Sequence, residues 1–70
     1  MEINLMHTDV KTVIRIMLAE TGSRGVSELA RQRGESESTL RSSINRGALR
    51  VEDLKWIASQ LGYSVIVRKD

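Results

Sequence analysis

The segment from Gly25 to Gly47 constrains the fold more than any other part of this 70-residue chain. Its apolar residues fall at helical spacing in two short runs, and Gly34 lies between them. Glycine adopts, without steric cost, the left-handed backbone that ends a helix in a tight turn. The pattern therefore predicts two helices, over about 26–33 and 37–45, joined as a helix-turn-helix whose core is 26–45.

Individual side chains explain why this segment forms two helices. Ala30 supplies the small side chain needed where two helices cross closely. Ser36 is placed to cap the second helix, where its hydroxyl accepts from an amide about three residues further on. Leu40 and Ile44, four residues apart, are expected to point into the core. The opposite face of the second helix then holds mostly short or hydrogen-bonding side chains, namely Glu37, Ser38, Arg41, Ser42 and Asn45.

Two further helices and two short strands are predicted around this unit. Asp9–Thr21 has its apolar residues on one helical face, and 51–61 has a similar face that ends at Gly62. Alternation over 2–6 and β-branched residues over 63–68 each predict a short strand. Because a lone strand cannot satisfy its backbone groups, the second is expected to pair with the first, with a second subunit, or with both.

The expected fold class is therefore mainly α: one small helix-turn-helix domain over 1–70, with about four helices and short terminal strands. A chain of this size buries only about 60% of its unfolded surface. It has no cysteine, so helix packing, an oligomer interface or both must stabilise it. No run approaches the roughly 20 apolar residues of a membrane span. The amino terminus does not resemble a signal peptide, and we expect a cytoplasmic protein.

Nothing in the sequence predicts an enzyme. His7 is the only histidine, and no carboxylate cluster accompanies it. The serines between Ser36 and Ser43 have no plausible base nearby, and helix caps and surface positions explain them better. We therefore expect no catalytic residue, no metal, no cofactor and no small-molecule ligand.

The charge of the chain adds a weaker signal. A formal net charge of +2 is only mildly basic. The guanidinium fork of arginine fits phosphates and guanine edges, but a solvated helical surface explains charged side chains equally well. The arginines crowd the middle of the chain: Arg24, Arg31, Arg33, Arg41, Arg46 and Arg50.

From Val26 to Gly62 the chain resembles the Cro/C1-type helix-turn-helix family of phage and bacterial repressors. Two residues depart from the family pattern: Glu35 stands where an apolar residue is usual in the turn, and Ser43 where isoleucine or valine is usual. Glu35 and Glu37 also place two acids close to where phosphates would lie. The matching residues are Leu29–Ala30, Gly34, Ser36, STL at Ser38–Leu40, IN at Ile44–Asn45 and the closing helix VEDLKWIASQLG.

The resemblance implies sequence-specific binding of double-stranded DNA by a homodimer on a palindromic operator, and transcriptional repression. Arg41 could donate two hydrogen bonds to a guanine, and Asn45 could pair with an adenine or hold a phosphate. Arg46 and Arg50 lie just beyond and could bind the DNA backbone. For Glu37, an acid that complements the helix dipole is an alternative to a base contact. The residues that the resemblance places at the DNA are Ser36, Glu37, Ser38, Arg41, Ser42 and Asn45.

A second function class fits the same scaffold. The terminal strand, or Trp56 beside the core, could recruit another protein, as in an antirepressor or antitoxin-like module. A protein binder should show an exposed apolar patch around either feature. A DNA reader should instead keep an exposed, positive face on the second helix, formed by Ser38, Arg41, Ser42 and Asn45.

Overall fold

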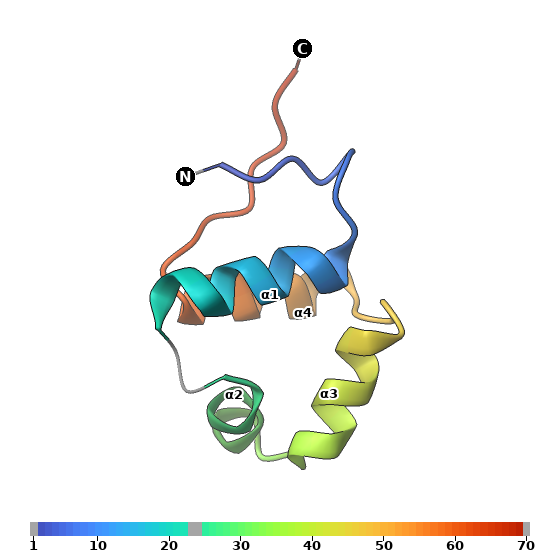
Figure 1. The fold of residues 1–70 in the computed structure, drawn as a ribbon, viewed down its shortest axis with the longest axis vertical. Coiled ribbons are helices and arrows are strands. Elements are labelled where there is room, and N and C mark those ends of the chain that lie inside the picture. The colour runs from blue at the N-terminus through green and yellow to red at the C-terminus, as the bar shows by residue number, and fades with distance from the viewer. Residues whose placement is uncertain (1, 23–24, 70) are drawn as a thin grey trace.

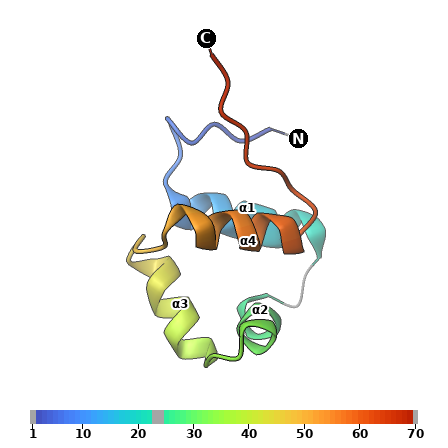
Figure 2. The ribbon, with the colours of Figure 1, turned by 180° about the vertical axis from the view of Figure 1, so that it is seen from behind.

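The four amphipathic segments form the helices that the sequence predicts. The computed structural model describes residues 2–22 and 25–69. Its helices are α1 (Val10–Thr21), α2 (Val26–Arg33), α3 (Glu37–Asn45) and α4 (Val51–Gln60). α1 and α4 lie side by side, and α2 and α3 form the other end of the molecule (Figures 1 and 2). The described part of the chain is therefore mainly α, as predicted.

Side chains that cap the helices set where α1 and α3 begin. The Asp9 carboxylate accepts from the Thr12 amide at 2.8 Å, and the Ser36 hydroxyl accepts from the Thr39 amide at 3.2 Å. Each bond satisfies one of the amides that has no partner within the first turn of a helix. The Ser36 cap agrees with the prediction, because the signal for it lies within three residues.

The turn between α2 and α3 depends on Gly34. Its φ of 72° lies in the left-handed region, where a side chain would strain the backbone. The Gly34 amide donates to the carbonyl of Arg31 at 3.1 Å, and the Glu35 amide donates to the carbonyl of Ala30 at 3.0 Å. Ala30 is only 1% exposed, and α2 contacts α3 directly. The small side chain predicted for this crossing is therefore in the core.

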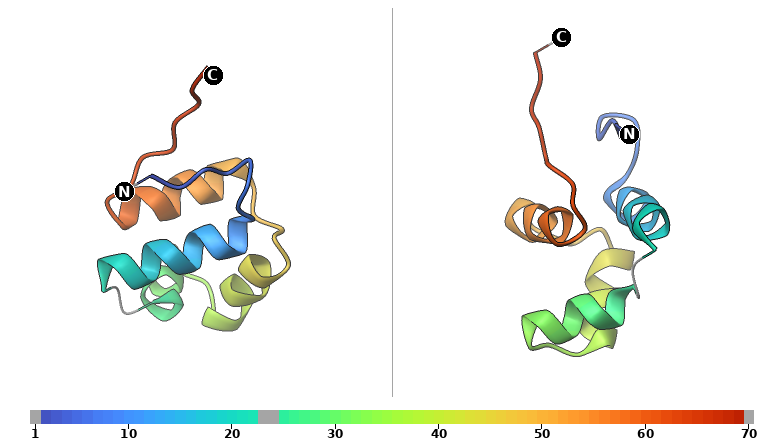
Figure 3. Two further views of the ribbon diagram at one scale, coloured as in Figure 1. Left: turned by 45° about the horizontal axis from the view of Figure 1, so that its top comes forward. Right: turned by 90° about the vertical axis from the view of Figure 1, so that its left-hand side faces the viewer.

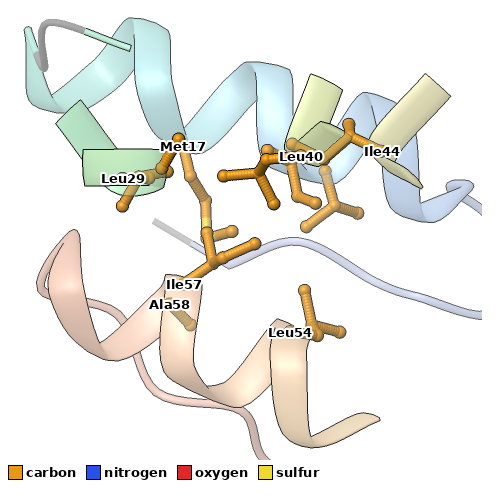
Figure 4. Packing of buried hydrophobic residues seen from close by; sticks show 10 residues of the cluster. Met17, Leu29, Leu40, Ile44, Leu54, Ile57 and Ala58 are labelled. Carbon is orange, nitrogen blue, oxygen red and sulfur yellow. The ribbon is translucent and has the colours of Figure 1, made fainter. Parts of the chain in front are cut away.

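One hydrophobic core joins all four helices (Figure 4). α3 contributes only Leu40 and Ile44 to it, so a single narrow face of this helix is buried. Trp56 packs against the core from its edge and stays partly exposed, as expected. The buried side chains are Val13, Ile14, Met17, Leu29, Ala30, Leu40, Ile44, Leu54, Ile57 and Ala58.

The two predicted terminal strands are wrong, since residues 2–22 and 25–69 contain no strand. Near the amino terminus the chain turns instead. The Asn4 carbonyl accepts from the His7 amide at 3.2 Å, and the Asn4 side chain accepts from the Met6 amide at 2.8 Å. Past Gly62 the chain leaves α4 as an irregular segment that runs outward (Figure 3). A strand needs a neighbour for its backbone groups, and the turned amino-terminal segment does not provide one.

The two terminal segments lie at the end of the molecule opposite α2 and α3 (Figures 1 and 3). An ion pair of 3.2 Å between Arg68 and Glu2 brings them together. Ile66 is 75% exposed and Val67 is 99% exposed. The carboxyl-terminal segment, residues 63–69, thus presents apolar side chains to solvent far from α3.

Candidate nucleic-acid interface

α3 is held by one face and leaves the other free. Leu40 and Ile44 are 1% and 4% exposed, and they fix the helix against the core. The helix contacts α2 and α1, and its outer side faces solvent (Figure 2). Five of the residues that the sequence places at the DNA are therefore together on one exposed surface, here called the α3 face: Glu37, Ser38, Arg41, Ser42 and Asn45.

Arg41, the candidate base reader, forms an ion pair in this structure. Its Nη2 atom donates to Glu37 Oε2 at 2.9 Å, and the two side chains are 54% and 47% exposed. Both residues belong to the α3 face and lie four positions apart, the spacing at which helical side chains meet. For Glu37 the sequence predicts only a helix-dipole role or a base contact. The i,i+4 spacing was the signal that could have predicted this pair.

Ser36 serves α3 through its hydroxyl. Besides accepting from the Thr39 amide, it donates to the Thr39 hydroxyl at 2.7 Å. Its oxygen also lies 3.4 Å from the Ser38 hydroxyl oxygen. The strong bonds of Ser36 are thus made within the first turn of the helix. Ser38 is exposed in the first turn of α3, two residues further along the chain.

The two arginines predicted to bind the DNA backbone follow α3. Arg46 is exposed at the end of the helix, and its Nε atom donates to the Ser42 carbonyl at 3.4 Å. The Arg50 side chain is 85% exposed, with its Nε atom 3.7 Å from Asp53. The Ser42 carbonyl is a neutral acceptor, so this bond does not compensate the positive charge of Arg46.

Lys11 joins this basic region, and the sequence analysis missed it. An open hollow of about 440 Å³ lies between the start of α1 and the end of α3, and Lys11, Asn45 and Arg46 are among its lining residues. The nearness of Lys11 to α3 results from the packing of α1, so no local pattern could indicate it. Asp9 lines the same hollow and adds a negative charge to it.

Arg33 belongs to the fold and not to the α3 face. Its Nη2 atom donates to Asp53 at 3.0 Å, and its Nε atom lies 3.8 Å from Glu35. The guanidinium also stacks over the Trp56 ring, 5.3 Å from the centroid. Glu35, the acid in the turn between α2 and α3, is therefore paired with an arginine of the preceding helix.

Two carboxyl groups have pKa values below the usual range. Burial raises the pKa of Asp53, but the Arg50 amide and the Arg33 guanidinium lower it by more. The pKa of Asp9 is lowered mainly by the Thr12 amide that donates to it. Both groups are thus stabilised in their ionised form, and both lie where a helix begins.

The remaining chemistry of the surface is sparse. Among residues 2–22 and 25–69, no group of three or more histidine, cysteine, aspartate or glutamate side chains could hold a metal ion. His7 is exposed. The longest described helix, α1, has 12 residues, and none of the described helices is long and apolar enough to cross a membrane.

The fold and the α3 face define a small helical domain in which a tight turn places one helix with its polar side outward. Comparisons with protein-family models, with curated proteins and with solved structures find no match.

Proposed function

We propose that this chain binds double-stranded DNA in a sequence-specific manner, with α3 in the major groove. The observation that carries the proposal is the α3 face: five polar or charged side chains are exposed on a helix that the core holds by only two residues. An α-helix with its side chains is about 10–12 Å wide, and the major groove is about 12 Å wide. α3 therefore has both the size and the side chains to read base edges.

The side chains of α3 and its surroundings divide by chemistry into two groups. Arg41 can donate two bonds to a guanine, and Asn45 can donate to and accept from an adenine. Arg46, Arg50 and Lys11 carry charge without such a fixed position in the groove, so they bind phosphates and supply affinity.

The ion pair with Glu37 does not prevent Arg41 from reading a base. An exposed pair at i,i+4 spacing contributes about 0.3–0.5 kcal/mol. A bidentate contact to the correct base contributes about 1–3 kcal/mol of discrimination. The guanine contact is therefore the stronger of the two, and a pair made through one atom of the guanidinium, Nη2, does not prevent it.

We further propose that the protein acts as a homodimer on a palindromic operator. It would be a bacterial or phage transcriptional repressor that acts in the bacterial cytoplasm. Two α3 helices must then enter successive major grooves about 34 Å apart. The two copies have to lie side by side, with their α2–α3 ends toward the duplex. Exposed apolar side chains of the terminal segments, including Met6, Ile66 and Val67, supply a surface for that association.

The experiment that tests the proposal is selection of bound duplexes from a random DNA library at physiological salt. We expect an enriched palindrome, whose half-site spacing reports the separation of the two α3 helices. The Arg41→Ala variant serves as the control, and it should select the same spacing with one base pair relaxed. Failure of the wild-type chain to enrich any sequence would contradict the proposal.

Protein binding is the second candidate function, and the exposed apolar carboxyl-terminal segment favours it. Val65, Ile66 and Val67 are 40%, 75% and 99% exposed, and their backbone can add a strand to a partner's sheet edge. A chain that selects no DNA sequence, yet loses a partner when these residues are changed, would have this function instead.

A further inference from the structure

We propose that Glu37 makes α3 selective by neutralising the charge of Arg41 while leaving its hydrogen-bond donors available. The inference rests on the proposed DNA binding and assigns Glu37 a part in it. Glu37 is a positioning residue here, because it acts on DNA recognition through Arg41.

The ion pair lies on the surface that would meet the DNA. Arg41 Nη2 and Glu37 Oε2 are 2.9 Å apart, and roughly half of each side chain is exposed, 54% and 47%. The pair is thus accessible to a ligand and not part of the core. Glu37 stands in the first turn of α3 and Arg41 in the second, so both would face the groove together.

Non-specific DNA binding depends on charge. Lys and Arg side chains bind phosphates and release counterions, and this supplies essentially all affinity for random sequence. Arg41 paired with Glu37 presents no net charge to a phosphate, and the carboxylate repels it. The pair therefore lowers the affinity of α3 for duplexes that offer only a backbone.

Base recognition depends on donors in a fixed geometry. A guanidinium has five N–H donors, and the bond to Glu37 Oε2 uses only one of its nitrogen atoms, Nη2. Guanine offers two acceptors, O6 and N7, to such a fork in the major groove. A guanine at the correct position can thus be bound by an arginine whose charge is already compensated.

Arg46 shows the contrast within the same region. Its Nε atom donates to the carbonyl oxygen of Ser42 at 3.4 Å, a contact that leaves the charge of the arginine in place. The region therefore has one arginine that reads bases, Arg41, and one that binds phosphates, Arg46. The ion pair with Glu37 is what distinguishes Arg41 from Arg46.

The test compares Glu37→Gln with Glu52→Gln on the selected duplex and on a scrambled duplex over a series of salt concentrations. Glu52 is the matched control, an exposed acid in the first turn of α4 that pairs with Lys55 at 3.4 Å. Glu37→Gln should tighten binding to the scrambled duplex by roughly threefold to tenfold and change the selected duplex much less. Its salt slope on the scrambled duplex should steepen by up to about 0.9. Glu52→Gln should leave the ratio of the two affinities unchanged.

A double variant shows whether Glu37 acts through Arg41. In an Arg41→Ala background, Glu37→Gln should lose most of its effect on the ratio of the two affinities. An unchanged ratio in the single variant would overturn the inference, and so would a loss confined to the selected duplex, because that result indicates a direct base contact by Glu37. If the wild-type chain selects no sequence, the proposed function fails as well; if it selects one and the ratio does not move, only this inference fails.

Discussion

The guanidinium of Arg33 lies 5.3 Å from the centre of the Trp56 ring and donates to Asp53 at 3.0 Å. The contacts join the end of α2 to the first turns of α4, and the charged side chains are only 26% and 16% exposed. Arg33 is one of six arginines that the sequence places near the middle of the chain. In the folded protein it connects the helix-turn-helix to the rest of the domain.

Replacement of Arg33 by alanine should therefore lower stability more than DNA affinity. Loss of the stacking and of a partly buried charged hydrogen bond should cost about 1–3 kcal/mol in the free energy of unfolding. Urea unfolding measures this cost. Arg31→Ala, which removes a surface pair with Glu28, should cost less than about 1 kcal/mol; equal costs for the two variants would contradict the role of Arg33.

Stability should fall in acid, partly through Asp53. Its pKa in the folded state is lowered relative to an unfolded value of about 3.9. The ionised carboxylate therefore stabilises the fold above the unfolded pKa, and this contribution is lost as the pH falls through the folded pKa. Urea midpoints measured from neutral pH down to about pH 2.5 should drop less steeply for Asp53→Asn than for the wild type. Parallel curves for the two proteins would show that Asp53 does not contribute. The Asp53→Asn variant should still lose some stability in acid, because the pKa of Asp9 is also lowered.

The Arg41→Ala variant tests base reading. It should weaken binding to the selected duplex by about 1–3 kcal/mol and relax the preference at one base pair. Titration against the selected duplex and its single-base variants measures both effects. Arg31→Ala changes an exposed arginine of α2 that is also paired with a glutamate, so it is the matched control and should leave the base preference intact. Equal losses on selected and random DNA would argue against a base contact by Arg41.

Arg46→Ala and Arg50→Ala should act differently, because phosphate contacts carry no sequence information. Each should weaken all duplexes alike and reduce the slope of log affinity against log salt by about 0.9. Arg68→Ala, at the end of the molecule away from α3, is the control and should leave the slope unchanged. A slope that stays at the wild-type value would remove the tested arginine from the interface.

Association through the carboxyl-terminal segment is open to a test with charged substitutions. Ile66 and Val67 are 75% and 99% exposed, so Ile66→Lys with Val67→Lys should not disturb the core and should leave thermal unfolding of the monomer unchanged. Sedimentation should show the dimer replaced by a monomer. Val51→Lys introduces a single lysine at an apolar side chain that is 67% exposed on α4 and should leave the dimer intact. Persistence of the dimer in the double variant would place the interface elsewhere.

The sequence predicts the four helices well because the signals that set them are local. The caps at Asp9 and Ser36 and the turn at Gly34 each act within a few residues, and the apolar spacing defines which face is buried. The α3 face follows from the same information, since Leu40 and Ile44 determine which side chains remain outside. The residues of the α3 face could therefore be predicted from the sequence, whereas the neighbouring residues from other helices could not.

The features that the sequence does not predict depend on distant contacts. β-Branched residues over 63–68 favour a strand, but a strand also needs a partner, and propensity does not supply one. The bond between Arg33 and Asp53 spans 20 residues, and Lys11 approaches Arg46 only through the packing of α1. Local patterns identify which residues are exposed and can indicate ion pairs at i,i+4 spacing, but they do not indicate pairs between residues that are distant in the sequence.

The two terminal segments that the structure describes, residues 2–9 and 63–69, lie on the side of the domain away from α3, along a molecule whose longest dimension is 38 Å. A fluorophore, an affinity tag or a whole additional domain joined at either end would therefore sit at a distance from the helix proposed to enter the groove. The same arrangement lets a fusion partner be attached while the α3 face stays uncovered, provided that its linker leaves Ile66 and Val67 free to associate. The domain can thus be used as a module, because the points of attachment and the α3 face lie at opposite ends of the molecule.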